Sequence, residues 1–230
     1  MANNNEDVMS RRRPLKQRGQ QILTRVLLGI VLAAAGCARL PYTTQVVQED
    51  QRVLVVIQRE VEPVGYTHPV KLSAQEIRSI LKGFSIREKK ALPLRWFAEE
   101  KPPQPLFRED ELNVLVPHLS VALEKVGPSD RVAFSVFAPG FNPAAARDTT
   151  SGWIAVRDPY WHLTIDHFHV QLPTRKSDPY DPNYPLVPAS PGDYLLTFEP
   201  GRFWIIDPAT KARAVDYREF LKSAESLPAR

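Results

Sequence analysis

The sequence predicts an α+β fold, a single domain with a largely antiparallel sheet and two or three helices. Two early segments carry apolar residues at helical spacing, and five or six short strand-like runs separated by turn residues follow them. The chain has 230 residues, 43% of them hydrophobic and 24% charged, which is typical of a globular protein with one core. We divide it into an N-terminal segment 1–36, a tether 37–50 and a folded domain 51–230.

The first elements of the domain have clear signals. The segment Gln51 to Val61 is predicted to be a strand. Its first half has apolar side chains on both faces, which indicates that both faces are covered there. Ser73 to Gly83 is predicted to be a helix, because Ser73 and Glu76 form a capping-box pattern and Gly83 supplies a stop.

A second helix is predicted from about Glu109 to Val126, with acidic residues in its first turn and one apolar stripe along its length. Pro117 lies inside it, so we expect a kink or a break there. Asp216 is predicted to cap a terminal helix that runs to about Ala224. Strands are expected at Arg131–Ala138, Gly152–Arg157, Tyr160–Leu172, Tyr194–Phe198 and Arg202–Ile206. Pro200 and Gly201 suggest that the last two strands form a hairpin.

The N-terminal segment has the organisation of an export signal. Eleven apolar residues, from Val26 to Gly36, follow a basic stretch, and this run is shorter than the roughly 20 residues that span a bilayer. It ends in small residues and Cys37, and this ending resembles the lipobox of bacterial lipoprotein precursors. Residues 10–16 also resemble the twin-arginine export motif, and the start at Met1 or Met9 stays open.

The resemblance implies that Cys37 is acylated, that residues 1–36 are removed as a signal peptide, and that the mature chain is anchored in a membrane by lipid. Ala38 stands where an aspartate would resemble an inner-membrane retention signal. By resemblance, therefore, the protein belongs on the periplasmic face of the outer membrane. Several acyl chains, at about 0.8 kcal/mol per buried methylene, would make this anchoring stable.

Charge and cysteine content exclude some classes of function. Six basic and two acidic residues lie in 1–36, which leaves 24 of each sign in the remainder. The mature chain therefore has no basic excess for nucleic-acid binding. Cys37 is the only cysteine, so Cys-rich zinc sites and internal disulfides are excluded. We find no GxSxG, phosphate-binding glycine loop, HExxH or CxxC motif, and we predict no cofactor.

His167 and His169 are the candidate metal ligands. In an unbroken strand they would point to the same side, as a two-imidazole site requires, and Asp158 or Asp178 could complete the site. The apolar alternation of this segment slips by one residue, however. A bulge at Asp166–His167 would explain the slip and leave His162 and His169 facing water, and we favour this interpretation.

A proline-rich segment at 173–191 is the other unusual feature. From Pro179 to Pro191, proline recurs at every third residue, which is the period of polyproline II and gives a rod of about 37 Å. It could be a docking strip in which Tyr180, Tyr184 and Leu186 contact an envelope partner. We favour a stiff, extended loop that lies against the domain through the same three residues.

The favoured function is a lipid-anchored cell-envelope protein with a structural, assembly or binding role, and enzymatic activity is the less favoured interpretation. One alternative is a metal-dependent hydrolase that uses His167 and His169. The other is a partner-binding module that acts through the Pro179–Pro191 strip.

Overall fold

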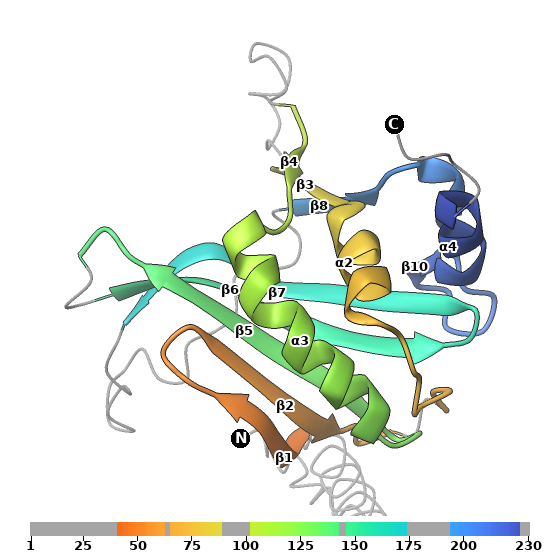
Figure 1. Ribbon diagram of the computed structural model, residues 1–230, viewed down its shortest axis with the longest axis horizontal. Coiled ribbons are helices and arrows are strands. Elements are labelled where there is room, and N and C mark those ends of the chain that lie inside the picture. Colours follow the sequence, from red (N-terminus) through yellow and green to blue (C-terminus); the bar gives the residue numbers. More distant parts are fainter. Residues whose placement is uncertain (1–40, 63–64, 89–101, 143–145, 174–193, 226–230) are drawn as a thin grey trace, which may run out of the picture. The chain divides into compact units, whose positions relative to one another are not determined.

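The protein is an α+β domain with a mostly antiparallel sheet, as the sequence predicts (Figure 1). The computed structural model describes residues 41–62, 65–88, 102–142, 146–173 and 194–225. Cys37, Asp178 and the predicted proline contacts Tyr180, Tyr184 and Leu186 lie outside these ranges.

The described residues form three α-helices, ten strands and one short 3-10 helix. In chain order these elements are β1 (Tyr42–Glu49), β2 (Val53–Arg59), α2 (Ala74–Lys82), β3 (Phe84–Glu88), β4 (Gln104–Pro105), α3 (Glu109–Lys125), β5 (Asp130–Pro139), β6 (Ala146–Arg157), β7 (Tyr160–Pro173), β8 (Tyr194–Phe198), η3 (Gly201–Phe203), β9 (Trp204–Ile206), β10 (Arg213–Asp216) and α4 (Tyr217–Glu225).

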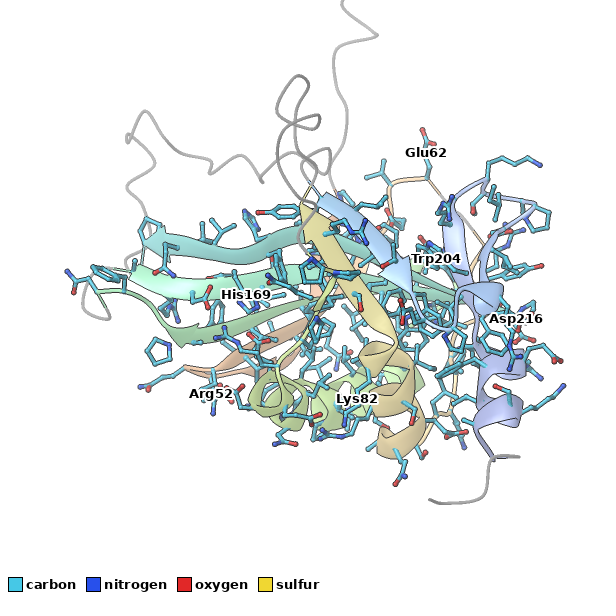
Figure 2. The ribbon with its side chains drawn as sticks, turned by 90° about the horizontal axis from the view of Figure 1, so that it is seen from above. Arg52, Glu62, Lys82, His169, Trp204 and Asp216 are labelled. Atoms are coloured by element: carbon cyan, nitrogen blue, oxygen red, sulfur yellow. The ribbon has the colours of Figure 1, made fainter. Side chains whose placement is uncertain are left out.

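Seven strands form the main sheet in the order β1-β2-β5-β6-β7-β10-β9, and every neighbouring pair is antiparallel. The helices lie on one side of this sheet (Figures 1 and 2). Helix α3 packs on β1, β2 and β5, whereas α4 packs on β7 and β10 and also contacts α2. The core lies between the two layers, where alternate residues of β5 (Val132, Phe134 and Val136) are buried with the apolar stripe of α3.

The three predicted helices are present, but the break considered at Pro117 does not occur. The capping box of α2 is present, since Ser73 Oγ accepts the Glu76 amide and the Glu76 carboxylate accepts the Ser73 amide. Asp216 accepts the Glu219 amide at the start of α4. Helix α3 continues through Pro117 without a break, because its buried stripe on both sides of the proline packs on the sheet. None of the helices in the described ranges has the length and hydrophobicity required to cross a bilayer.

Strand β1 corrects the expected boundary of the domain. Residues 42–49, assigned to the tether from their polar composition, pair with β2 as an edge strand and contact α3. The pairing contains two irregularities, and most side chains of β1 are exposed. Edge strands bury little apolar surface, which explains why the hydrophobic pattern did not reveal this one.

The predicted hairpin around Pro200–Gly201 is wrong. Strand β8 belongs to a second sheet with the order β4-β3-β8, whereas β9 pairs with β10 at the edge of the main sheet. The rings of Phe84 and Phe198 pack edge to face, with centroids 4.9 Å apart, and the Glu199 amide donates to the Gly83 carbonyl. These contacts favour pairing of β8 with β3, which directly follows α2, over pairing with its neighbour in the sequence.

Candidate functional site

The candidate site lies where β7 departs from regular pairing with β6. Ser151 is opposite His167 and Gly152 is opposite Ile165, so Asp166 is an extra residue in β7. The predicted bulge at Asp166–His167 is therefore confirmed. A second extra residue lies between His167 and Val170, where His169 adopts a positive φ of 49°. Such a backbone conformation is uncommon outside glycine and often occurs at functional sites.

The bulges place the two predicted histidines in different surroundings. His167 Nδ1 lies 2.8 Å from Ser151 Oγ, and burial lowers the pKa of His167. His169 instead faces Thr150 and Asp148, which alternate with Ser151 along β6 and therefore lie on the other face of the sheet. The structure thus brings each imidazole to its own partners and does not bring the two together.

The prediction that His162 and His169 face water is not borne out. The His169 side chain is 26% exposed and contacts Asp148, and His162 differs further from the prediction. Its side chain is buried instead of facing water, and its Nε2 lies 3.1 Å from Oδ2 of the buried Asp207. This Nε2 has no hydrogen-bond partner among the described residues. Burial lowers the pKa of His162, although Asp207 opposes this effect. The third proposed ligand, Asp158, contacts Tyr217 and Arg218 near α4.

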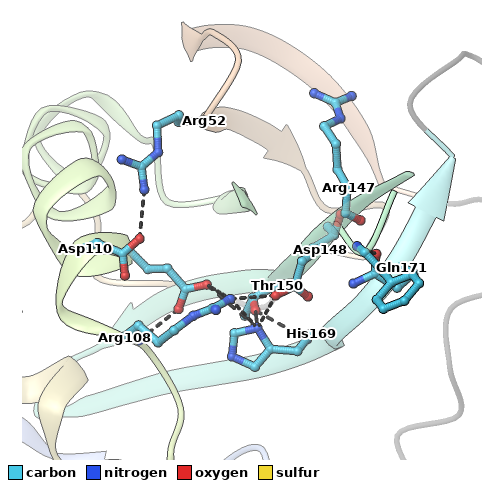
Figure 3. A network of polar contacts seen from close by, with 11 residues as sticks. Arg52, Arg108, Asp110, Arg147, Asp148, Thr150, His169 and Gln171 are labelled. Carbon is cyan, nitrogen blue, oxygen red and sulfur yellow. Dashed lines mark hydrogen bonds and ion pairs between the residues drawn. The ribbon is translucent and has the colours of Figure 1, made fainter. Parts of the chain in front are cut away.

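Around His169 a cluster of charged side chains connects β6, β7 and the start of α3 (Figure 3). Arg108 Nη2 is its centre and lies 2.6 Å from Asp148 Oδ2, 3.2 Å from Glu111 Oε1 and 2.9 Å from His169 Nδ1. His169 Nδ1 is also 3.2 Å from Asp148 Oδ2. We call Arg108, Glu111, Asp148 and His169 the polar cluster.

Glu111 is the most deeply buried member, with a side chain only 2% exposed. It lies in the first turn of α3, where its Oε2 accepts the Arg108 amide at 2.8 Å. The amide groups at a helix N-terminus favour a negative charge, and Arg108 pairs with the same carboxylate. Both interactions offset the cost of burying a carboxylate, which is several kcal/mol for an unpaired ion.

Arg108 remains charged in this setting. Partial burial works against its charge, but hydrogen bonds and charge from Asp148 and Glu111 outweigh burial and raise the pKa of Arg108. All three of its contacts to described residues involve Nη2, so Nη1 and Nε have no hydrogen-bond partner there. The Arg108 side chain is 48% exposed, so these unpaired donors are accessible.

The position of one proton decides how His169 binds within the polar cluster. A protonated Nδ1 donates to Asp148 but then faces the donor Nη2 of Arg108. An unprotonated Nδ1 accepts from Arg108 but then faces the Asp148 oxygen. Each state satisfies one neighbour and opposes the other.

A cavity of about 780 Å³ adjoins the polar cluster. Its lining is largely apolar, with Lys82, Arg108, Glu109 and His169 among the polar residues. The lining residues are Leu81, Lys82, Phe84, Gln104, Pro105, Phe107, Arg108, Glu109, Leu112, Phe168 and His169. A second cavity of about 300 Å³ is lined by Ile86, Leu163, Thr164, Ile165, Asp166, Phe168, Tyr194, Leu196, Trp204, Ala212 and Arg213. Phe168 is thus common to both cavities.

Sequence reasoning found His169 but not the other members of the polar cluster. Glu111 was predicted only as one of the acidic residues in the first turn of a helix, and Asp148 lies in a segment that was not predicted as strand. The register of β6 against β7 and the packing of the start of α3 bring these residues together. In the described ranges, no three His, Cys, Asp or Glu side chains are arranged to hold a metal ion.

Comparison with known proteins gives no family for this chain. No protein-family model matches it, and neither a curated protein nor a solved structure is significantly similar to it.

Proposed function

We propose that the chain is a lipid-anchored envelope protein whose folded domain has a structural, assembly or binding role. The single observation that carries this proposal is the N-terminal pattern, in which a basic stretch precedes the apolar run Val26–Gly36 and small residues lead into Cys37. The pattern also accounts for the only cysteine in the sequence.

The position of the first strand supports the proposal. Strand β1 begins at Tyr42, five residues after Cys37, and five residues span at most about 17 Å. An acylated Cys37 would therefore hold the domain close to the bilayer surface. Such a short connection suits a protein that binds its partner or ligand at the membrane. The cavity beside the polar cluster favours a binding role within this general proposal.

Metabolic labelling tests the proposal directly. The full chain, expressed in a bacterium with two membranes and supplied with labelled palmitate, should incorporate label and lose residues 1–36. Cys37→Ser should abolish both events, so that the unprocessed chain accumulates. The matched control Ala38→Ser, one residue further on, should incorporate label normally. Equal labelling of the Cys37→Ser chain would refute attachment at Cys37.

A further inference from the structure

The two cavities that share Phe168 have the size and chemistry of one ligand site. The larger, at about 780 Å³, is within the range of known small-molecule sites, and the smaller is at the lower limit of that range. Phe168 is partly buried, with its ring centroid 4.5 Å from that of His169 in the first cavity and 5.7 Å from that of Tyr194 in the second. Phe168 is therefore the residue at which the linings of the two cavities meet.

The backbone of β7 is arranged so that Phe168 and His169, adjacent in sequence, both line the larger cavity. Neighbouring residues of a regular strand point to opposite faces. The positive φ of His169 removes this alternation and brings an aromatic ring and an imidazole to one space. An uncommon local conformation is thereby used to build the cavity wall.

The polar end of the larger cavity has two cationic side chains, Lys82 and Arg108. Arg108 Nη1 and Nε, and His169 Nε2, have no hydrogen-bond partner among the described residues. The carboxylate of Glu109, which also lines this cavity, is bound by Lys82 at 2.6 Å and Arg78 at 3.3 Å. In the tautomer whose Nδ1 accepts from Arg108, His169 Nε2 carries the proton and is a donor as well. A ligand acceptor would bind these donors, and a cationic donor binds an anionic acceptor most strongly.

We propose that this site binds a single-chain amphiphile with an anionic headgroup, held by Arg108 and His169, and with its apolar chain extending past Phe168. Buried Leu81, Phe84 and Leu112 line the larger cavity, and Ile86 and Trp204 line the smaller one, so apolar side chains are available to an apolar chain in both cavities. Carboxylate and phosphate headgroups share the required chemistry. This ligand class deepens the proposed binding role, and a membrane-proximal domain has access to such molecules.

Photo-crosslinking of the full chain in its host membranes tests the proposal. A photoreactive dodecanoate should label peptides that contain Leu112 or Phe168. Unlabelled dodecanoate or dodecyl phosphate should compete, and the stronger of the two identifies the headgroup. Dodecyltrimethylammonium should not compete. Equal competition by the cationic amphiphile, or labelling outside the two cavities, would overturn the proposal.

Three variants sharpen the test. Arg108→Gln should weaken labelling about tenfold through the loss of charge-assisted hydrogen bonds. Gln104→Trp fills the larger cavity from an exposed position, so it should reduce labelling without unfolding the chain. The matched control Arg52→Gln removes an exposed ion pair with Asp110 outside the cavities and should leave labelling unchanged. Unchanged labelling in Gln104→Trp would contradict the site even if Arg108→Gln fails to fold.

The result is separable from the question of lipid attachment. The same labelling on the Cys37→Ser chain should still map to the two cavities, because the site is built from residues 81–213. Cavity labelling without acylation would leave the ligand site intact and refute only the anchor. Acylation without cavity labelling would support the anchor and refute the ligand site.

Discussion

At the scale of single residues, the polar cluster depends on Arg108 as the cation that neutralises a buried carboxylate. Arg108→Gln leaves Glu111, which is almost fully buried, without its ion-pair partner. An unpaired buried charge is costly, so we expect a loss of about 1–3 kcal/mol of unfolding free energy in urea denaturation. The control Arg52→Gln, which breaks an exposed pair, should change stability by less than about 0.5 kcal/mol. Equal effects of the two variants would show that Glu111 needs no partner.

His68 makes the fold sensitive to acid. Burial lowers the pKa of His68 to about 4, and its Nε2 accepts the Val156 amide. Because the folded chain holds this imidazole neutral, the unfolded chain takes up the proton at a higher pH than the folded chain does. Its contribution to stability is complete above the ordinary pKa of about 6.5 and is lost as pH falls towards 4, by up to about 3 kcal/mol. The lowered pKa values of His162 and His167 act in the same direction.

Urea denaturation at pH 7 and pH 5 measures this effect. The substitution His68→Gln retains an acceptor for the Val156 amide but cannot be protonated, so it should reduce the loss of stability between the two pH values. The matched control His118→Gln, on the partly exposed side of α3, should leave that loss unchanged. If His68→Gln loses as much stability on acidification as the wild-type chain does, His68 is not the source of the acid sensitivity.

At the scale of elements, local signals predicted the helices well and the sheets less well. Ser73 and Glu76 mark the start of α2 through contacts between residues three positions apart. Contacts between such close neighbours can be predicted from the sequence. Pairing of β8 with β3 depends on Phe84 and Phe198, which are 114 positions apart. The polar cluster likewise depends on two extra residues in β7, and the sequence revealed only the first of them as a slip in alternation.

The capping box of α2 should contribute measurably to the free energy of unfolding. Ser73→Ala removes the acceptor for the Glu76 amide, and we expect a loss of about 1 kcal/mol. Ser79→Ala is the matched control within the same helix. Its hydroxyl bonds only the Gln75 carbonyl, so its loss should be neutral or slightly stabilising. Thermal or urea denaturation distinguishes the two, and a larger effect at Ser79 would contradict the capping account.

Gly152 allows β6 to approach β7 next to the bulge. A Cβ at this position would collide with the backbone carbonyl of Thr164. A backbone atom cannot move aside as the end of a flexible side chain can. We expect Gly152→Ala to cost more than about 2 kcal/mol and to shift the NMR signals of His167 and His169. Gly201→Ala, with open space around its Cβ, should do neither. Unshifted imidazole signals in Gly152→Ala would show that the bulge tolerates a wider strand separation.

At the scale of the whole molecule, the fold class and the single domain were predictable because they follow from hydrophobic periodicity and the order of elements. The domain boundary was not predictable, because β1 is a polar edge strand. Its composition does not indicate a strand, and only its pairing with β2 makes it one. The ligand site could not be predicted from the sequence either, because its lining comes from eight elements, from α2 to β10, between residues 81 and 213.

Membrane destination gives a prediction at this scale. Ala38 occupies the position where an aspartate would resemble an inner-membrane retention signal. In a host with two membranes, Ala38→Asp should move the protein from the outer to the inner membrane fraction while its acylation is unchanged. The conservative control Ala38→Ser should stay in the outer membrane. Identical distributions for all three chains would place the sorting signal elsewhere.

Mass spectrometry of the mature N-terminus tests the central claim, anchoring through Cys37, most directly. After proteolysis of the membrane-bound protein, we predict an N-terminal peptide that begins at Cys37 and carries the added mass of a diacylglycerol and usually one further acyl chain. No peptide from residues 1–36 should remain on the mature protein. Recovery of an intact, unmodified peptide that spans Gly36 and Cys37 from the membrane fraction would contradict the account.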